Sequence, residues 1–144
     1  MSGKFVVGYD GSEMAKRAVS FAAARAKAQD GTIVLVHVLE WSPYSFLTPN
    51  EVEERHKRRK EELVRAETAL MDPVAAKLRE DGITVETQIK YGHIAETLAA
   101  ISKSTGALEI IIGRNGHSPI GSRVSGSVAG NLVQTAPVPC TIVP

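Results

Sequence analysis

Two glycine-containing segments hold the residues whose types and spacing could do chemistry. The first is Gly8-Tyr9-Asp10-Gly11-Ser12, and the second runs from Gly113 to Ser127 with the spacing G-x2-G-x9-G-S. Glycines accept positive φ angles and let the backbone approach a ligand closely. A Gly-Ser pair that opens a helix offers free N–H groups and a hydroxyl to an anion. The pattern therefore indicates binding of a phosphate-bearing ligand.

Several residues near these segments have a second interpretation. Asp10 and Ser12 are also typical of a simple turn after a strand, where short polar side chains bond the local backbone. Arg114 and Arg123 could add positive charge for a phosphate, and each is equally consistent with a solvated loop cation. No P-loop, dinucleotide fingerprint, catalytic triad or metal-ligand set accompanies the glycines. We therefore expect binding, with no catalytic residue and at most slow hydrolysis of the ligand, since no residues are committed to positioning a water.

Short β-branched runs alternate with helical patterns along the whole chain. Strands are predicted at 4–9, 32–39, 84–90, 108–112 and 140–143. The second and fourth are continuously apolar, as parallel strands buried on both faces must be. Right-handed crossovers place the intervening helices on both faces of such a sheet. The sequence therefore predicts a three-layer α/β fold in one domain, residues 1–144.

The helices have start signals that the sequence makes visible. Ser12 is a predicted N-cap, and Thr48-Pro49-Asn50-Glu51 combines a capping threonine, proline at the first helical position and a following glutamate. The charge run 51–67 predicts a solvated helix face. Proline cannot continue a helix undisturbed, so Pro73 predicts a kink, or a break with Asp72 capping a new segment. It interrupts an apolar stripe at helical spacing: Leu63, Ala66, Leu70, Val74 and Leu78.

Composition excludes several classes of protein. Seventeen Lys and Arg residues against 16 Asp and Glu residues give a net charge of +1, and 5% of the residues are aromatic. This composition does not indicate a nucleic-acid-binding protein. One cysteine excludes an internal disulfide framework, and no apolar run is long enough to span a membrane. The first residues lack a signal-peptide layout. We expect a cytoplasmic protein.

The chain resembles the universal stress protein family (UspA-like) over essentially its whole length. The resemblance rests on Val7 to Ser12, on Val36-His37-Val38, on the spaced glycines that end in Gly126-Ser127, and on residues 136–143. It implies a Rossmann-like, adenine nucleotide alpha hydrolase-like fold, an open parallel sheet with strand order 3-2-1-4-5. That order sets the first and fourth strands side by side. The G-x2-G-x9-G-[S/T] signature resembles that of the ATP-binding branch.

The resemblance also implies which residues contact the nucleotide. It implies that Gly8 and Asp10 lie beside the nucleoside, that Val38 packs on the adenine, and that Gly113 and Arg114 lie near the ribose. The implied phosphate-binding residues are Gly116, Gly126, Ser127 and Val128. The implied ligand is ATP, with ADP or AMP as alternatives and with Mg2+ held through phosphates rather than by side chains.

Three functions stay open at this point. The first is an ATP-binding regulatory module of the stress response that acts through a protein partner. The second is a nucleotide-independent protein of the same fold that acts through partner contacts, and the third is an enzyme acting on a phosphorylated small molecule. The strand 140–143 has no later element to cover its edge, and exposed edges invite pairing. We therefore expect a homodimer through this strand, as the family resemblance also implies.

Overall fold

Five parallel strands form the sheet in the computed structural model, which describes residues 3–40, 48–115 and 126–144. Their order is β3-β2-β1-β4-β5, as expected. Each predicted strand is present, with bounds that differ by two residues at most: β1 (Lys4–Gly8), β2 (Thr32–Glu40), β3 (Thr84–Gly92), β4 (Glu109–Gly113) and β5 (Cys140–Val143).

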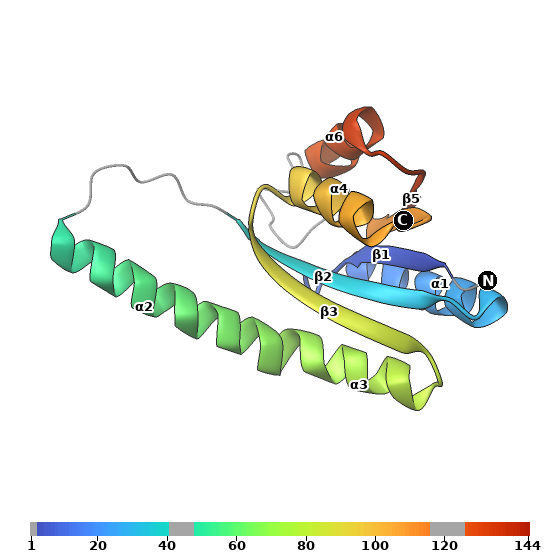
Figure 1. The fold of residues 1–144 in the computed structure, drawn as a ribbon, viewed down its shortest axis with the longest axis horizontal. Helices are drawn as coiled ribbons and strands as arrows, with labels where there is room; N and C mark the ends of the chain where they lie inside the picture. Colours follow the sequence, from blue (N-terminus) through green and yellow to red (C-terminus); the bar gives the residue numbers. More distant parts are fainter. Residues whose placement is uncertain (1–2, 41–47, 116–125) are drawn as a thin grey trace.

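Helices cover both faces of the sheet, which confirms the three-layer fold (Figure 1). On one face α1 (Glu13–Gln29) and α3 (Asp72–Glu80) pack against the strands, and on the other face lie α4 (Ile94–Thr105) and α6 (Gly126–Thr135). Successive residues of the central strands alternate between the two cores, as Val6 and Val7 do. The continuously apolar runs follow from this double burial.

Helix α1 begins as its sequence predicts. Ser12 is the N-cap, and its Oγ accepts a hydrogen bond from the backbone N–H of Ala15 at 3.1 Å. The helix ends at Asp30, which adopts the left-handed conformation and donates its N–H to the carbonyl of Ala26. The predicted apolar stripe is buried: Ala15, Ala18, Val19, Ala22 and Ala26. Small side chains on this face let α1 lie close to the sheet.

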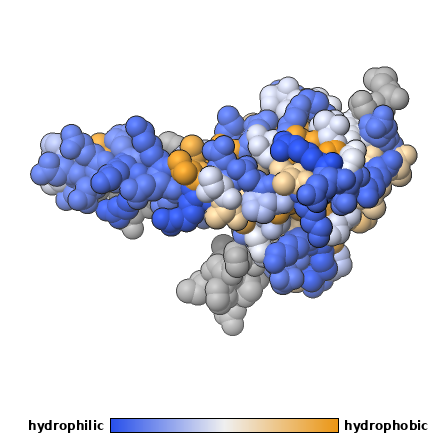
Figure 2. Space-filling model, turned by 90° about the horizontal axis from the view of Figure 1, so that it is seen from below, coloured by the Kyte–Doolittle hydropathy of each residue, from blue (hydrophilic) through white to orange (hydrophobic). Residues whose placement is uncertain are grey.

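Helix α2 (Pro49–Arg65) starts at its predicted cap and buries no residue. The Oγ1 of Thr48 accepts a hydrogen bond from the N–H of Glu51 at 3.2 Å. The predicted solvated face is therefore confirmed for this helix. Figure 2 shows α2 as a largely hydrophilic extension from the rest of the molecule.

The sequence left two outcomes open at Pro73, a kink or a break with Asp72 as a cap, and the break is wrong. The chain stays helical through a π-helical turn, η1 (Ala66–Met71), which leads directly into α3. Asp72 is helical, makes no side-chain cap, and donates its N–H to the carbonyl of Glu67 five residues earlier. A wider turn before the proline makes room for its ring and shifts the hydrogen-bond register past the missing donor.

The π turn also changes which side chains are buried. The expected stripe stepped by four residues from Ala66 to Leu70, yet Leu70 is only partly buried and Met71 is completely buried. The step from Ala66 to Met71 is five residues, the length of one π turn. No helix among the described residues is long and apolar enough to cross a membrane.

Candidate functional site

The two unusual segments meet at one edge of the sheet, as far as the structure describes them. Strands β1 and β4 are parallel neighbours, with Val7 opposite Ile111. We call residues 9–12 the β1 exit and residues 114–115 the β4 exit, because each follows the C-terminal end of its strand. Ligands of open parallel sheets bind at such an edge, where the strand order reverses.

Asp10 shapes the β1 exit. Its Oδ1 accepts a hydrogen bond from the N–H of Ser12 at 2.9 Å, and Gly11 between them has a φ of 83°. The turn-forming interpretation of Asp10 is therefore correct for one carboxylate oxygen. Within the described residues Oδ2 has no hydrogen-bond partner, so a partly exposed anionic oxygen remains at this edge.

The two strand-end glycines have packing reasons of their own. A Cβ on Gly113 would lie 2.7 Å from the carbonyl carbon of Met14, so only glycine lets the first turn of α1 approach β4 this closely. A Cβ on Gly8 would lie 3.1 Å from Ile112 Cγ2 and 3.2 Å from Leu98 Cδ1. Both glycines stand at the predicted edge. Their missing side chains serve helix packing there, whatever ligand the edge accepts.

Helix α1 also contacts the β4 exit through Met14. The thioether sulfur Sδ of Met14 accepts a hydrogen bond from the backbone N–H of Asn115 at 3.2 Å. The next residue back, Arg114, donates its N–H to the carbonyl of Val143 in β5 at 2.8 Å. Sequence reasoning missed Met14, because a single methionine after a helix cap has no distinctive spacing.

His37 ties β2 to the β1 exit. Its Nδ1 lies 2.8 Å from the carbonyl oxygen of Tyr9, and a carbonyl only accepts, so Nδ1 carries the hydrogen. Tyr9 in turn donates its backbone N–H to the carbonyl of Val36 at 2.8 Å. His37 is thus a partly buried, hydrogen-bonded residue of β2. Val38, one residue further, is partly buried against the core formed by α4 and α6.

Burial raises the pKa of Tyr9 above its ordinary value of 10.0. Lys16 lowers this pKa, whereas the negative charges of Asp10 and Glu13 raise it further. The phenol at the β1 exit is therefore neutral under physiological conditions. It can donate a hydrogen bond but cannot act as an anion.

The predicted phosphate-binding residues are only partly within the described chain. Gly116 and Arg123 lie outside it, whereas Gly126 and Ser127 open α6, as predicted for a helix near Ser127. The side chain of Val128 packs against the core on that face. Arg114 is exposed, and its guanidinium has no partner among the residues that the structure describes.

No group of three or more metal-ligating side chains is found in the described ranges. The arrangement at this edge offers backbone N–H groups at the start of two helices, a carboxylate oxygen and a cationic side chain. Such a set suits a small polar ligand that has hydroxyl and phosphate groups.

Comparisons with known proteins identify the family. A family model described as the universal stress protein family matches residues 1–144. A relative from Thermus aquaticus, the universal stress protein in the QAH/OAS sulfhydrylase 3′ region, is 34% identical over 140 residues and 96% of each chain is covered. The solved universal stress protein UspA from Lactobacillus plantarum has a TM-score of 0.85 at 21% identity, covering 99% of this chain and 97% of that one.

Other solved structures of this fold hold adenine nucleotides. A universal stress protein in complex with cAMP matches with a TM-score of 0.64 at 22% identity, covering 99% of this chain and 96% of that one. An Archaeoglobus fulgidus protein in complex with dAMP has a TM-score of 0.62 at 17% identity, with 100% and 98% covered. An Arabidopsis thaliana protein with AMP bound has a TM-score of 0.62 at 20% identity, with 98% and 90% covered.

Proposed function

Because this chain belongs to the universal stress protein family, we propose that it is a regulatory protein of the stress response that binds an adenine nucleotide at the C-terminal ends of β1 and β4. The preferred ligand is ATP, with ADP and AMP as alternatives, and the setting is the cytoplasm. Structural neighbours that hold cAMP, dAMP or AMP support the ligand class.

The juxtaposition of the β1 and β4 exits is the observation that carries this proposal. The nucleoside lies against Gly8, Asp10 and Val38, where Asp10 Oδ2 accepts a hydrogen bond from it. Gly113 and Arg114 lie near the ribose. The phosphates are held by the segment that leads to the N-terminus of α6: Gly116, Gly126, Ser127 and Val128.

The proposed activity is binding rather than turnover. Fast phosphoryl transfer needs a positioned water and charge stabilisation in the transition state. The described part of the edge offers one carboxylate, which is already committed to the turn at Ser12 through one oxygen. Mg2+ is held by phosphate oxygens and water, and hydrolysis is at most slow.

Direct identification of the ligand tests the proposal. Protein purified without added nucleotide is denatured, and released small molecules are identified by chromatography and mass spectrometry. The emptied protein is then titrated by calorimetry with Mg-ATP, ADP, AMP and cAMP, with GTP as the control for base recognition. We expect a saturable isotherm for at least one adenine nucleotide and none for GTP. A protein that is purified empty and ignores all adenine nucleotides contradicts the proposal.

Asp10→Asn gives the sharpest variant for the site. The amide oxygen of asparagine still accepts from the N–H of Ser12, so the turn survives, but the negative charge is lost. We expect nucleotide affinity to fall about tenfold or more, since bonds to charged groups are the stronger ones. The matched control is Asp72→Asn, because Asp72 is exposed in the helical run at η1 and α3. Equal affinity of both variants contradicts the assignment of Asp10.

A nucleotide-independent interaction protein is the second candidate, and β5 favours it. Within the described residues β5 pairs with β4 on one side and with no strand on the other. The backbone carbonyls of Pro139 and Val143 accept hydrogen bonds from β4 and the residue after it. Because backbone groups alternate along a strand, the N–H and C=O groups of Cys140 and Ile142 point away from β4. We propose that two copies pair through this edge.

Light scattering at micromolar concentration tests the dimer. We expect twice the mass of the 15.4 kDa chain. Ile142→Pro removes an outward N–H and should yield the monomer. Nucleotide binding at the C-terminal ends of β1 and β4 is measured separately. A monomeric mass for the unchanged chain contradicts the pairing.

A further inference from the structure

The hydrogen bond between Met14 and Asn115 is an unusual connection between two elements of the candidate site. A thioether is a weak acceptor, yet here it is the partner of a backbone N–H directly after β4, at an S–N distance of 3.2 Å. Met14 is the second residue of α1, so this one contact joins the start of that helix to the β4 exit. The oxidation state of this sulfur atom therefore affects how Asn115 is held.

Oxidation of this sulfur is incompatible with the contact as it stands. An N–H···O hydrogen bond alone occupies about 2.7–3.2 Å between its heavy atoms. The distance from Sδ to the nitrogen of Asn115 is 3.2 Å, so an oxygen bonded to sulfur does not fit between them. Either the sulfur withdraws or the oxygen points elsewhere and the N–H loses its acceptor. Both outcomes break the contact between Sδ and the N–H of Asn115 that holds the β4 exit in its present position.

The burial of its alanine-rich face on the sheet keeps α1 from moving aside to compensate. A Cβ on Gly113 would already lie 2.7 Å from the carbonyl carbon of Met14 and 2.9 Å from the nitrogen of Ala15. The first turn of α1 thus rests on the end of β4, and its helix is fixed by a buried alanine-rich face. The displacement is therefore taken up by the residues after Gly113.

Exposure favours reaction at Met14. Met14 is partly exposed, whereas Met71, the last residue of η1, is completely buried. Met1 lies outside the described residues. Burial and the charge of Glu109 raise the pKa of the Cys140 thiol, which lowers its thiolate fraction and its reactivity toward peroxide. The chain thus contains a reactive methionine at the candidate site and a buried one as an internal reference.

We propose that Met14 is an oxidative modification site at which hydrogen peroxide weakens nucleotide binding by displacing the β4 exit. One peroxide oxygen is transferred to Sδ: the O–O bond breaks, an S–O bond forms, the sulfur loses two electrons and water leaves. A thiol-dependent methionine sulfoxide reductase reverses the step, removing the oxygen as water while two thiols become a disulfide. The effect on affinity rests on the proposed nucleotide function, whereas the oxidation and the displacement do not.

Limited treatment with hydrogen peroxide tests the proposal on the full chain. Peptide mass spectrometry should find one added oxygen on Met14 while Met71 stays unmodified. Calorimetry with the adenine nucleotide that binds best should show an affinity about three- to tenfold lower, the effect expected of one lost hydrogen bond. Methionine sulfoxide reductase should restore the affinity.

Two variants separate this effect from other oxidations. Met14→Leu keeps the size of the side chain without the sulfur, so its affinity, whatever its starting value, should not change on peroxide treatment. Met71→Leu keeps Met14 and should respond as the unchanged chain does. Met1 and Cys140 are present in both variants, so any effect of their oxidation on affinity is the same in both.

The outcomes are distinguishable. If Met14 resists peroxide, or if its oxidation leaves affinity unchanged, the inference is overturned. If the untreated protein binds no adenine nucleotide, the proposed function fails, and hydrogen exchange then tests the inference by itself. Oxidation should accelerate exchange of the Asn115 amide, which loses its acceptor, and unchanged exchange there overturns the inference without any nucleotide.

Discussion

Helices α1 and α2 are each 17 residues long, yet they obtain their stability in different ways. α1 buries a continuous small-residue face on the sheet and brings Met14 to the candidate site. α2 buries nothing and extends away from the sheet (Figure 1). The comparison shows that the sheet determines α1, whereas α2 depends on its cap, its own charges and a connection to β3.

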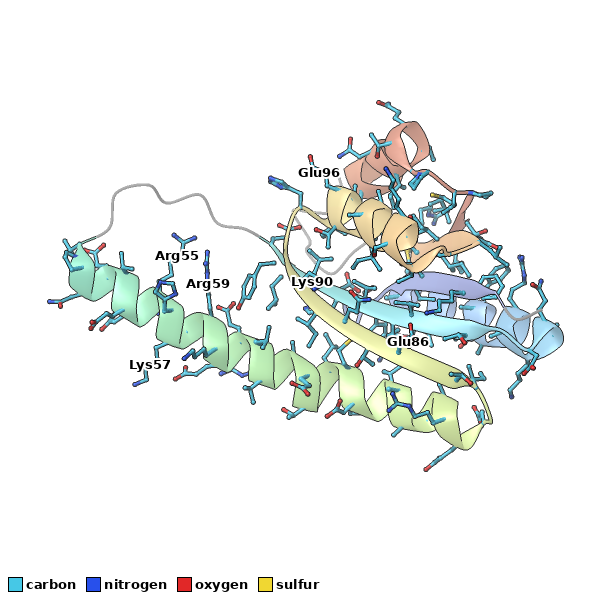
Figure 3. All side chains as sticks on the ribbon, in the orientation of Figure 1. Arg55, Lys57, Arg59, Glu86, Lys90 and Glu96 are labelled. Carbon is cyan, nitrogen blue, oxygen red and sulfur yellow. The ribbon has the colours of Figure 1, made fainter. Side chains whose placement is uncertain are left out.

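That connection is Tyr91. Its hydroxyl donates to the backbone carbonyl of Arg59 at 2.7 Å, and the Arg59 guanidinium carbon lies 5.3 Å from the centre of the tyrosine ring. Arg55 and Arg59 project from α2 toward the side of β3, whereas Lys57 points away (Figure 3). Local opening of α2 should therefore cost less free energy than opening of α1.

A charge introduced into each helix, at a buried position of α1 and an exposed position of α2, should give the largest contrast in stability. Ala22 is completely buried under α1, so Ala22→Asp should lower the free energy of unfolding by about 3 kcal/mol or more. Val64 in α2 is 55% exposed, and Val64→Asp should change the free energy of unfolding by less than about 0.5 kcal/mol. Urea titrations measure both values. Equal losses in the two variants contradict the contrast.

A methyl group added at the contact between α1 and β4 should have the next largest effect on stability. Gly113→Ala places a Cβ against the backbone of Met14 and should destabilise the protein by about 1–3 kcal/mol. Gly130 in α6 has nothing within 4 Å of the same added atom, so Gly130→Ala should stabilise by about 0.5–1 kcal/mol through helix propensity. Thermal unfolding compares the two variants, and a shift of the same sign in both argues against a tight contact at Gly113.

Removing the Tyr91 hydroxyl should have a smaller, local effect. Tyr91→Phe keeps the ring beneath Arg59 and loses the hydrogen bond to its carbonyl. We expect the opening free energy of α2 to fall by about 0.5–1.5 kcal/mol. Hydrogen exchange of residues 49–65 should accelerate while that of α1 stays the same. Unchanged exchange in α2 means that Tyr91 does not hold the helix.

The exposed ion pair within α2 should matter least. Arg58 Nη2 lies 3.5 Å from Glu54 Oε2, one helical turn away, with both side chains largely exposed. Glu54→Gln should therefore cost about 0.3–0.5 kcal/mol at low salt and less at high salt. Hydrogen exchange of α2 at two ionic strengths measures this difference. A larger loss that persists at high salt contradicts a solvated pair.

The same contrast explains how far the sequence could predict the structure. The caps at Ser12 and Thr48 and the doubly buried strands follow local rules, so they were predictable. The π turn was not, because its signal is a five-residue step from Ala66 to Met71 that only the packing against the sheet selects. The buried Glu109 was also not predicted: it is held by Arg25 at 2.9 Å and by the Thr141 hydroxyl, residues distant in the chain.

The candidate site divides in the same manner. The glycine spacing and Asp10 identified the site at the C-terminal ends of β1 and β4. Two motifs that each follow a strand lie close together whenever the strand order makes the two strands neighbours. The tight contact of Gly113 with α1 and the bond from Asn115 to Met14 depend on where the helix rests on the sheet. No spacing rule contains that information.

Amide chemical-shift mapping during a titration with AMP and Mg-ATP tests the central claim most directly. The account predicts saturable shifts at residues 8–12 and 113–115, with the amides of α2 beyond its contact with Tyr91 unchanged. Shifts confined to α2, or none at either strand exit at saturating nucleotide, would contradict a nucleotide site between β1 and β4.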